Sequence, residues 1–504
     1  MLVYGLALLG ALFALIFWFR FREKKVAGAF RALFFLSILT YLGSWLSQAA
    51  PMDYKFEVLI RDLVFIGVLG TAFSYIANLR TAFWIGLLLT VGGGYYYYKT
   101  ILRPTFPFQE QTTESTLSPD GELLIELQQG SDLEMLRSLL DQYNLTVERA
   151  FFPERPEATD LDDFYVVDAP DGADLPTIRK ALRQKAIIEH IEENEQITVE
   201  PIKSNKLPPK IEKRYGINDP GLENLWSFDR MQMDKLFELL KDVKPQRQAV
   251  VAILDTGVDA KHEDLADNFT SIRSRYDNDP RGHGTHCAGI AGAVSNNGVG
   301  VASYSRNNAF VDITSVKVLN AYGMGNQKTI INGIIEATDK GADVISLSLG
   351  GPSNDSRQRA YSQAVAYAKK SGVIVVAAAG NSDMNAKDYS PANADGIITV
   401  SAVDNELKKA VFSNTVQDVG LGIAAPGVGI YSTVPDNGYD TYNGTSMACP
   451  YVSGLIGLMK SIKPDLTAEE AHKILKSTGA KTDQTRMTGK FIQPAAAMAK
   501  VINR

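Results

Sequence analysis

The sequence predicts a chain of three parts: an all-α membrane region, a small α+β unit, and a larger α/β domain built on a parallel sheet. Three observations lead to this prediction. Residues 1–98 are strongly apolar, residues 121–201 contain one short series of strands and helices, and from Ala249 onward apolar strands alternate with helical segments. A length of 504 residues is enough for about three domains.

The composition of the chain argues against two classes of protein, those that bind nucleic acid and those held together by disulfides. The net charge is −6 and there is no long basic run, so nucleic acid is not an expected partner. The sequence has two cysteines, Cys287 and Cys449, which excludes a fold that depends on a framework of disulfides. We expect two buried free thiols, and a disulfide between them is the alternative.

Four apolar segments in residues 1–98 are each about long enough to cross a bilayer, the last two only just. Positive charge follows the first segment and does not precede it, which is not the order of a signal peptide. Almost no ionisable residue falls in the middle of a segment, which favours a membrane anchor over a channel. The four segments are Leu2–Phe19, Ala27–Leu46, Leu63–Ala77 and Ala82–Tyr98.

The charges between the first two segments predict the topology of this region. Arg20, Arg22, Lys24 and Lys25 lie together after the first segment, which places that loop in the cytoplasm. Counting through four spans, the N-terminus and everything after Tyr98 lie outside. We therefore expect a multi-pass protein of a bacterial cytoplasmic membrane, with the lipid bilayer as a partner and the large domain on the extracytoplasmic side.

A small unit lies between two linkers. Residues 99–120 are rich in Pro, Thr, Ser, Gln and Glu and form the first linker, and residues 202–217 form an exposed second linker with a predicted processing site. Residues 121–201 have the order β-α-β-β-α-β, which is that of a ferredoxin-like unit. Its expected elements are strands at Glu122–Leu127, Leu145–Phe151 and Asp163–Val167, helices at Asp132–Tyr143 and Leu175–Arg183, and a last strand region at Ile187–Ile191 and Gln196–Val199.

Residues 218–504 form the large domain, and its first buried strand, Ala249–Leu254, ends at Asp255. A carboxylate at the C-terminal end of a parallel strand lies where such sheets place their ligands. Taken alone, an Asp in a turn is the more common explanation.

Two histidines, His283 and His286, lie at the start of a segment of small residues. The usual zinc-binding helix spaces its histidines four apart with a Glu between them, and no nearby carboxylate completes a ligand set, so a metal site is not favoured. A histidine that takes a proton from a serine must pack closely against a neighbouring element. The Gly and Ala residues around His283 allow such packing.

Two further strands end in residues suited to binding. Asp343–Leu349 leads into Gly350 and Gly351, and a strand with such an end and an open edge can pair with an extended peptide. Val373–Ala379 is followed by Asn381, whose side chain can donate an N–H to an oxyanion. Taken alone, this Asn is more often a turn residue.

Ser446 lies in a polar turn that leads into an apolar run, Tyr451–Met459, expected to be a buried helix. Gly444 allows the turn to bend sharply, and Pro450 is expected in the first helical turn, where a missing N–H costs least. Ser446 then lies at a helix N-terminus, where the dipole favours developing negative charge. Taken alone, a serine at this position is more often a simple helix cap.

Together, these segments resemble the subtilisin-like serine proteases. The resemblance covers about residue 218 to the C-terminus, and its motifs occur in the order of the family, which makes it specific. The motifs are Asp-Thr-Gly at 255–257, His-Gly-Thr-His at 283–286, Ser-Leu-Gly-Gly at 348–351, Ala-Ala-Gly-Asn at 378–381 and Gly-Thr-Ser-Met-Ala at 444–448.

The resemblance implies a serine endopeptidase that works through an acyl-enzyme and needs no cofactor for its chemistry. It implies Ser446 as the nucleophile, His283 as the base, and Asp255 as the residue that orients the imidazole. Asn381 and the Ser446 N–H are the implied oxyanion donors. The implied partner is an extended polypeptide substrate, bound by Ser348, Leu349 and Gly350 on one side, by Gly323 and Gly325 on the other, and by Ala379 and Gly380 at the specificity pocket.

Members of this family often bind structural calcium, for which Asp264, with Asn296 or Asn297, is the candidate ligand set. The small unit resembles the family's pro-domain, which assists folding and inhibits the enzyme. We therefore expect a membrane-tethered, self-processing zymogen that is inhibited by its own pro-domain. The tail of the pro-domain, near Glu200–Lys206, is expected to lie in the cleft as the first substrate, with Asn218 near the start of the mature enzyme. The alternative is a latent membrane sensor or scaffold that keeps its protease fold inhibited and acts by binding.

Overall fold

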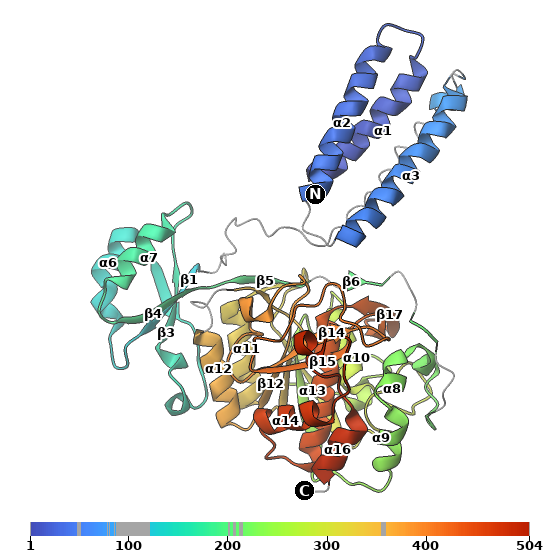
Figure 1. Cartoon of the computed structure of the whole chain (residues 1–504). Helices are drawn as coiled ribbons and strands as arrows, with labels where there is room; N and C mark the ends of the chain where they lie inside the picture. Colours follow the sequence, from blue (N-terminus) through green and yellow to red (C-terminus); the bar gives the residue numbers. More distant parts are fainter. Residues whose placement is uncertain are drawn as a thin grey trace. The chain divides into compact units, whose positions relative to one another are not determined.

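The computed structural model (Figure 1) describes residues 2–47, 52–77, 79, 81–84, 86, 121–199, 202–204, 208–210, 215–353 and 359–502. The chain divides into two compact units, Met1–Ser115 and Thr116–Arg504.

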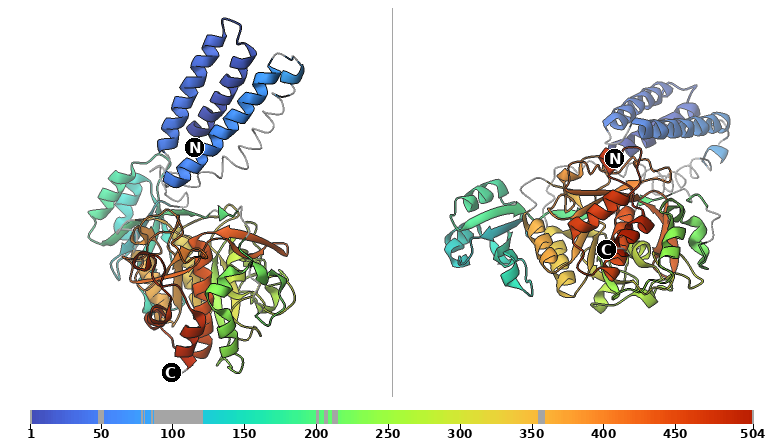
Figure 2. Two further views of the ribbon diagram at one scale, coloured as in Figure 1. Left: turned by 45° about the vertical axis from the view of Figure 1, so that its right-hand side comes forward. Right: turned by 60° about the horizontal axis from the view of Figure 1, so that its bottom comes forward.

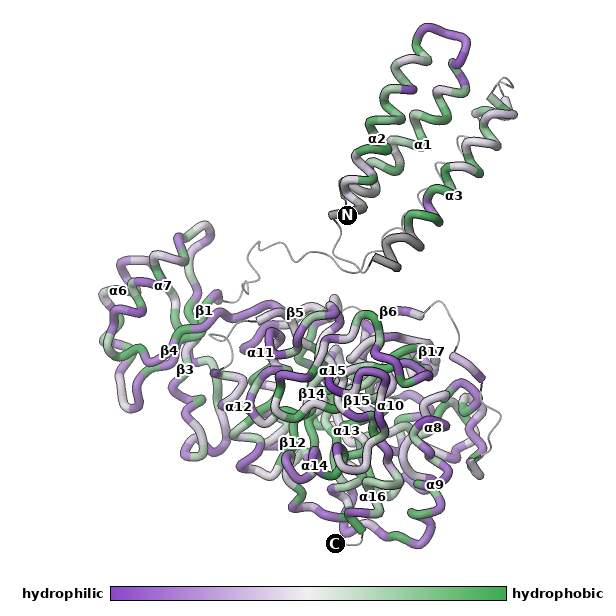
Figure 3. Tube along the Cα trace, viewed as in Figure 1, coloured by the Kyte–Doolittle hydropathy of each residue, from purple (hydrophilic) through white to green (hydrophobic). Residues whose placement is uncertain are grey.

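The first unit consists of apolar helices, and hydrophobic residues recur along α1 (Leu2–Arg20), α2 (Ala27–Ser47) and α3 (Met52–Ile76) (Figure 3). These helices contain the first three expected spans. The third begins well before Leu63, because the stretch that starts at Met52 carries no Pro or Gly to stop a helix. Of the expected fourth span, Ala82–Tyr98, residues 82–84 and 86 are described and helical, and the rest lies outside the described residues.

By length and composition, one helical stretch among the described residues, Ala27–Ser44, is long and apolar enough to cross a membrane. Gly10–Arg20 and Asp62–Ile76 are shorter apolar helical stretches. Inside the unit the hydroxyl of Tyr41 donates to a carboxylate oxygen of the buried Asp62 at 3.1 Å, so this carboxylate is paired. A region of four spans therefore stays a prediction.

The second unit begins with a four-stranded antiparallel sheet in the order β2-β3-β1-β4. Apolar residues of α6 and α7 form one core with this sheet. The elements follow one another in the predicted order β-α-β-β-α-β. They are β1 (Leu123–Leu127), α6 (Arg137–Tyr143), β2 (Thr146–Arg149), β3 (Phe164–Asp168), α7 (Leu175–Arg183) and β4 (Ile188–Glu193).

Two short strands after β4 pair differently from the predictions. β5 (Gln196–Thr198) was expected in the small sheet but pairs with β9 (Met324–Asn326) of the large domain. β6 (Ile202–Lys203) was expected in an exposed linker but pairs with β17 (Gly438–Asn443). Both pairings are antiparallel. The edges of the large domain offer unpaired backbone N–H and C=O groups, and the chain that leaves the small sheet satisfies them.

Six parallel strands form the sheet of the large domain, in the order β15-β14-β12-β10-β7-β8. Most of their residues are buried, as expected for a parallel sheet covered on both faces. The predicted parallel α/β class is therefore confirmed. The strands are β7 (Ala249–Asp255), β8 (Val311–Lys317), β10 (Val344–Leu347), β12 (Ile374–Ala378), β14 (Ile398–Val403) and β15 (Leu421–Pro426).

Helices cover both faces of this sheet (Figures 1 and 2). On the face of Leu254, α11 and α12 share one apolar cluster with the strands. On the other face α13 lies so close that a Cβ on Gly457 would meet Val251 Cγ2 at 2.8 Å, and α10 packs beside it. The four helices are α10 (His283–Gly292), α11 (Gln327–Asp339), α12 (Arg359–Lys370) and α13 (Thr445–Ile462).

Helix α13 corrects one sequence prediction. It begins at Thr445, so Pro450 lies inside the helix and not in its first turn. Because proline has no N–H, the carbonyl of Ser446, four residues earlier, lacks the usual helical hydrogen bond. This carbonyl accepts instead from Ser348 Oγ at 2.8 Å and from Cys287 Sγ at 3.5 Å. Because of the proline, the first turn of α13 forms hydrogen bonds with the segment after β10 and with α10.

Candidate active site

The four residues expected to do chemistry lie where the C-terminal ends of the strands meet the N-terminal ends of two helices. Asp255 ends β7, and Asn381 follows β12. His283 is the first residue of α10, and Ser446 is the second residue of α13. The three residues of the expected triad are buried, with exposed fractions of 0% for Asp255, 1% for His283 and 7% for Ser446.

Asp255 and His283 form a buried carboxylate–imidazole pair. The imidazole Nδ1 lies 2.8 Å from Oδ1 and 2.9 Å from Oδ2 of the carboxylate. An ionised carboxylate only accepts hydrogen bonds, so Nδ1 carries the proton and Nε2 is the basic nitrogen. The backbone N–H of Thr256 donates to Asp255 Oδ1 at 2.8 Å. Such a pair can take up a proton and stabilise the positive charge that results.

Glycine allows α10 to approach β7 closely enough for this contact. A Cβ on Gly284 would lie 2.1 Å from the carbonyl oxygen of Gly257 and 3.1 Å from Asp255 Cβ. Gly282, just before the helix, has φ 86°, a conformation that residues with a side chain rarely adopt. The small residues in this motif therefore have a direct steric reason.

Ser446 and Ser348 are joined by two reciprocal hydrogen bonds. The Ser446 hydroxyl donates to the Ser348 carbonyl at 2.9 Å, and the Ser348 hydroxyl donates to the Ser446 carbonyl at 2.8 Å. In this conformer the Ser446 hydroxyl therefore does not bond to His283. A substrate N–H that bonded to the Ser348 carbonyl would release the Ser446 hydroxyl, which a rotation about χ1 can redirect.

Asn381 and the backbone at Ser446 line a small space beside Gly444. Asn381 Oδ1 accepts from the N–H and the hydroxyl of Thr445 at 2.8 and 2.9 Å, which fixes the orientation of the amide. A Cβ on Gly444 would lie 3.6 Å from Asn381 Nδ2 and 3.5 Å from the Ser446 nitrogen. The missing side chain leaves a space that faces two N–H donors, which suits an oxyanion.

The residues expected to bind an extended peptide on one side lie at β9, where they already contact the chain. The backbone N–H of Val199 donates to the Gly323 carbonyl at 2.7 Å, and Ile197 pairs with Gly325. This side of the expected cleft is thus paired with the segment that follows the small sheet.

The expected residues on the other side continue from β10. Ser348, Leu349 and Gly350 lead into β11 (Gly351–Pro352), which pairs with β13 (Tyr389–Ser390). The predicted pocket residues Ala379 and Gly380 have their N–H groups in use, because they donate to the Val400 carbonyl at 2.9 Å and to Thr445 Oγ1 at 3.1 Å. Neither N–H is therefore available to a substrate in this conformer.

His286 supports the site without matching a catalytic role. Its ring stacks on Tyr442 with 4.3 Å between centroids, and its Nε2 lies 3.1 Å from the carbonyl oxygen of Ile430. Burial lowers the pKa of His286 to about 3, so the ring stays neutral.

Cys287 and Cys449 are both buried free thiols, as predicted. Burial raises the pKa of Cys449 to about 11 and that of Cys287 well above its usual value. Among the described residues, Asp255, His283 and Cys287 form one group of possible metal ligands with atoms within 4.8 Å of one another. The imidazole already bonds to the carboxylate and the thiol stays protonated, so this group does not fit a metal ion.

The calcium candidate Asp264 is fully buried. One carboxylate oxygen accepts from Asn297 Nδ2 at 2.9 Å and the other from the Val301 N–H at 2.7 Å. Asp219 lies near enough to affect it, and the Asn296 N–H donates to the Asp219 carboxylate at 2.8 Å. The pKa of Asp264 is raised to about 7, mainly by burial, and the charge of Asp219 is among the further causes.

The buried carboxylates of Asp264 and Asp219 have the oxygen atoms that calcium prefers. The Asn297 amide does not fit the ion, because its nitrogen donates to Asp264 and its oxygen accepts from the Val299 N–H at 3.0 Å. The side chain that reaches Asp264 is that of Asn297, whereas Asn296 contributes its N–H to Asp219. Asp219, the second carboxylate of this group, was not predicted from the sequence. Its only signal was its place beside Asn218 and Pro220 in the expected start of the mature enzyme.

The comparisons with known proteins concern the large domain. Residues 246–491 match the sequence profile of the subtilase family. Subtilisin DY from Bacillus licheniformis is 41% identical over 257 residues, which make up 50% of this chain and 90% of that protein. Thermitase from Thermoactinomyces vulgaris is 44% identical over 225 residues, which make up 44% of this chain and 77% of that protein. Subtilisin from Bacillus pumilus is 36% identical over 257 residues, or 50% of this chain and 90% of that protein.

These similarities establish the class of protein: the large domain is a serine endopeptidase with a subtilisin-like parallel α/β fold. The chain belongs to the subtilase family. Members of this family generally need no cofactor for their chemistry and often bind structural calcium.

The space beside Gly444 gives a test of the site. The Gly444→Ala variant should lose about 100-fold or more of kcat/KM on a peptide substrate, because the methyl group fills the space in front of two N–H donors. The backbone of Gly444, at φ 151° and ψ 157°, is also in a region that only glycine occupies readily, so alanine would be strained there. Gly420→Ala is the matched control, because nothing lies within 4 Å of a Cβ at that position. Full activity of Gly444→Ala would contradict the oxyanion interpretation.

Proposed function

We propose that Ser446, His283, Asp255 and Asn381 carry out peptide-bond hydrolysis. Ser446 Oγ attacks the substrate carbonyl carbon, its proton passes to His283 Nε2, and the peptide C–N bond breaks as the leaving nitrogen takes that proton. Water then repeats these steps on the acyl-enzyme. Asp255 holds the imidazole and stabilises its charged form, while Asn381 Nδ2 and the Ser446 N–H bind the oxyanion.

The observation that carries this proposal is the contact of His283 Nδ1 with both oxygens of Asp255. The imidazole belongs to a helix that also contacts the Ser446 carbonyl, through Cys287. A serine hydroxyl is a weak nucleophile without an adjacent base, and this arrangement supplies the base. The substrate would be a polypeptide in extended form between Ser348–Gly350 and Gly323–Gly325.

The small unit at residues 121–199 is the ferredoxin-like pro-domain in this proposal. Its contacts with the N-terminal ends of α11 and α12 support this role. Glu192 is fully buried and accepts from Gln327 Nε2 at 2.8 Å and from the Ala360 N–H at 3.3 Å. The Lys328 N–H donates to Asn194 Oδ1 at 3.0 Å. A carboxylate at the N-terminus of a helix is favoured by the helix dipole.

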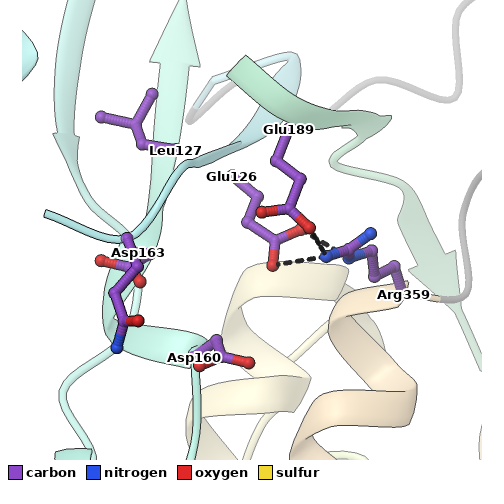
Figure 4. Close-up of a pocket in the computed structure, with 7 residues that line it drawn as sticks. Glu126, Leu127, Asp160, Asp163, Glu189 and Arg359 are labelled. Atoms are coloured by element: carbon purple, nitrogen blue, oxygen red, sulfur yellow. Dashed lines mark hydrogen bonds and ion pairs between the residues drawn. The ribbon is translucent and has the colours of Figure 1, made fainter. Parts of the chain in front are cut away.

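A second buried carboxylate of the small unit also has a partner on α12. Glu126 and Glu189 both pair with the guanidinium of Arg359 (Figure 4). Gln363 Nε2 donates to Glu126 at 2.9 Å. Burial raises the pKa of Glu126 and Arg359 offsets part of that shift. Because removal of Arg359 would leave a buried charge unpaired, this ion pair supports a specific docking of the unit onto the enzyme.

The segment after the small unit supports the role of an internal first substrate. β5 pairs with β9, and β6 pairs with the end of β17, where Asn443 lies three residues before Ser446. The chain is therefore held on both sides of the proposed nucleophile. Glu200 and Pro201 join the two paired stretches and lie outside the described residues.

Self-processing is the direct test. The purified full-length chain should convert to a shorter form by a cut within residues 200–217, and Ser446→Ala should remain intact, because the cut needs the nucleophile. Gel electrophoresis and mass spectrometry of the new N-terminus measure this. An intact wild-type chain that also resists labelling by a serine-directed phosphonate would contradict the enzymatic proposal.

One observation favours a second candidate function, a latent membrane protein that keeps its protease fold inhibited and acts by binding. The start of the catalytic domain is already bonded in the uncut chain. The Gly221 N–H donates to the Gly300 carbonyl at 2.6 Å, and the Gly298 N–H donates to Asn218 Oδ1 at 2.9 Å. Folding of the catalytic domain therefore does not need the cut. An intact chain that the phosphonate labels once the small unit is removed would support this candidate.

Residues 1–98 tether the enzyme to a membrane in this proposal, with the catalytic domain on the extracytoplasmic side. Many large apolar side chains of these helices are about half exposed or more, and such side chains suit a lipid environment better than water. Among the described residues of α1 to α3, those with an exposed fraction of at least 48% are Phe13, Phe35, Leu36, Leu39, Ile60, Leu63, Val64, Val68 and Tyr75.

The tether predicts a fractionation result. Full-length Ser446→Ala should stay in the membrane pellet after carbonate extraction, whereas a chain that begins at residue 99 should not, because only the former contains the apolar helices. In intact cells an added protease should digest the full-length catalytic domain if it lies outside. Recovery of the full-length chain in the soluble fraction would contradict the tether, and complete protection of the domain would contradict the proposed orientation.

We also propose that the carboxylates of Asp264 and Asp219 hold a structural calcium ion. Without calcium, a carboxyl with a raised pKa binds more protons in the folded than in the unfolded state, so stability falls as pH rises from about 4 to about 7. Calcium favours the ionised carboxylate and should offset this loss.

The test is the Tm of Ser446→Ala with calcium or with a chelator at pH 5 and pH 8. Calcium should raise the Tm by several degrees at pH 8, and by less at pH 5, because the carboxylates must be ionised to bind the ion. Asp264→Asn should abolish the effect. Asp267→Asn, which removes an exposed carboxylate nearby, is the control. An equal calcium response in both variants would exclude Asp264 as a ligand.

A further inference from the structure

Asp279 is a buried carboxylate, 5% exposed, that the proposed reaction does not use. It accepts five hydrogen bonds from the elements that carry Asp255 and His283. Oδ1 accepts from Thr256 Oγ1 at 2.7 Å, from the Gly282 N–H at 2.9 Å and from the Arg281 N–H at 3.1 Å, and Oδ2 accepts from the N–H and the hydroxyl of Thr285, both at 2.8 Å. The donors immediately follow Asp255 and flank His283 on both sides.

The Thr256 hydroxyl has two possible acceptors and one hydrogen. It lies 2.7 Å from Asp279 Oδ1 and 3.2 Å from Asp255 Oδ1. The shorter distance gives the hydrogen to Asp279. The hydroxyl oxygen also accepts from the Gly284 N–H at 3.1 Å, which holds it in place. Asp255 is therefore left with the Thr256 N–H and the imidazole as its donors on this side.

We propose that Asp279 is a positioning residue for the catalytic pair: it draws the Thr256 hydroxyl hydrogen away from Asp255 and fixes the turn before His283. This rests on the proposed roles of Asp255 and His283. A carboxylate that accepts an additional hydrogen bond holds a proton or a cation less strongly. By taking the Thr256 hydrogen, Asp279 leaves the charge of Asp255 available to the imidazolium that forms during the reaction.

The charged and titratable groups that interact with Asp279 come from four elements. They are Arg281 in the same turn, Lys317 at the end of β8, Cys287 on α10 and Tyr442 on β17. Lys317 Nζ bonds to Asn278 Oδ1 at 2.5 Å, and its pKa is lowered by burial, an effect that Asp279 opposes. The pKa of Tyr442 is raised to about 12, mainly by burial, with Asp279 among the further causes. The charge of Asp279 therefore contributes to the pKa of Lys317, Tyr442 and Cys287.

Loss of this carboxylate has a specific consequence. Without its acceptor, the Thr256 hydroxyl turns to Asp255 Oδ1, which already lies 3.2 Å away. The added hydrogen bond weakens the support of Asp255 for the imidazolium, so the base becomes weaker. The acid limb of the pH profile of kcat/KM should then move to lower pH, and the plateau should fall.

The experiment compares pH profiles of kcat/KM for the self-processed protein and its variants. Asp279→Ala, which leaves no side-chain acceptor for the Thr256 hydroxyl, should move the midpoint of the acid limb down by about 0.5–1 pH unit and lower the plateau by about tenfold, with little change in KM. Asp279→Ser is the second variant, because serine also suits a turn, and should shift the limb in the same direction. Asp277→Asn is the matched control, since it removes a carboxylate of the same turn that bonds to Ser271 and not to the pair.

Removal of the Thr256 hydroxyl separates the proposed route from general loosening. Thr256→Val combined with Asp279→Ala should recover more than half of the shift in the acid limb, because no hydroxyl is left to turn toward Asp255. Thr256→Ser keeps the hydroxyl and should leave the midpoint of the acid limb in place.

Several results would overturn this inference. They are an unmoved acid limb in both Asp279 variants, an equal shift in Asp277→Asn, or no recovery in the double variant. If both Asp279 variants fail to fold, a Thr256→Ser profile displaced from the wild type overturns it. Activity that persists in Ser446→Ala would instead refute the proposed function itself, so the two failures are distinguishable.

Discussion

The site depends on one carbonyl group that a helix would normally keep for itself. Pro450 removes the N–H that would bond to the Ser446 carbonyl, and that oxygen bonds instead to Ser348 and Cys287. The first turn of α13 is thereby connected to the end of β10 and to α10, which carries His283. Three elements far apart in the sequence meet at the backbone of a single residue, so a shift of any one of them changes the position of the proposed nucleophile.

Close backbone approach is the second constraint, and it explains why each of the five motifs contains glycine. Side chains on Gly284 and Gly257 would collide with backbone atoms at about 2 Å, and a side chain on Gly444 would fill the space in front of the two oxyanion donors. These glycines therefore set the distances between the proposed catalytic groups, which belong to the polar residues beside them. Substitutions that add one methyl group test geometry without removing any functional group.

Local patterns in the sequence predicted the parallel sheet and the ends of strands at Asp255 and Asn381, because these follow from periodicity and turn residues. Three features escaped prediction because they depend on contacts between distant segments. β5 pairs with the large domain and not with the small sheet, since the edge at β9 competes for it. Helix α13 begins before Pro450, since buried packing outweighs the missing hydrogen bond. The carboxylates of Asp219 and Asp279 are brought to Asp264 and to the Asp255–His283 pair by the tertiary fold. No hydrophobic periodicity or turn pattern in the sequence predicts either position.

The pairing of the chain on both sides of Ser446 has a kinetic consequence. In the proposed zymogen, a strand tethered to its own binding site competes with substrates at a fixed effective concentration, so the degree of inhibition in the uncut chain is the same however much protein is present. The proposed cut within residues 200–217 makes that competition bimolecular. It also severs the covalent link between the catalytic domain and residues 1–98, so dilution away from the proposed inhibitor and departure from the proposed anchor become a single event.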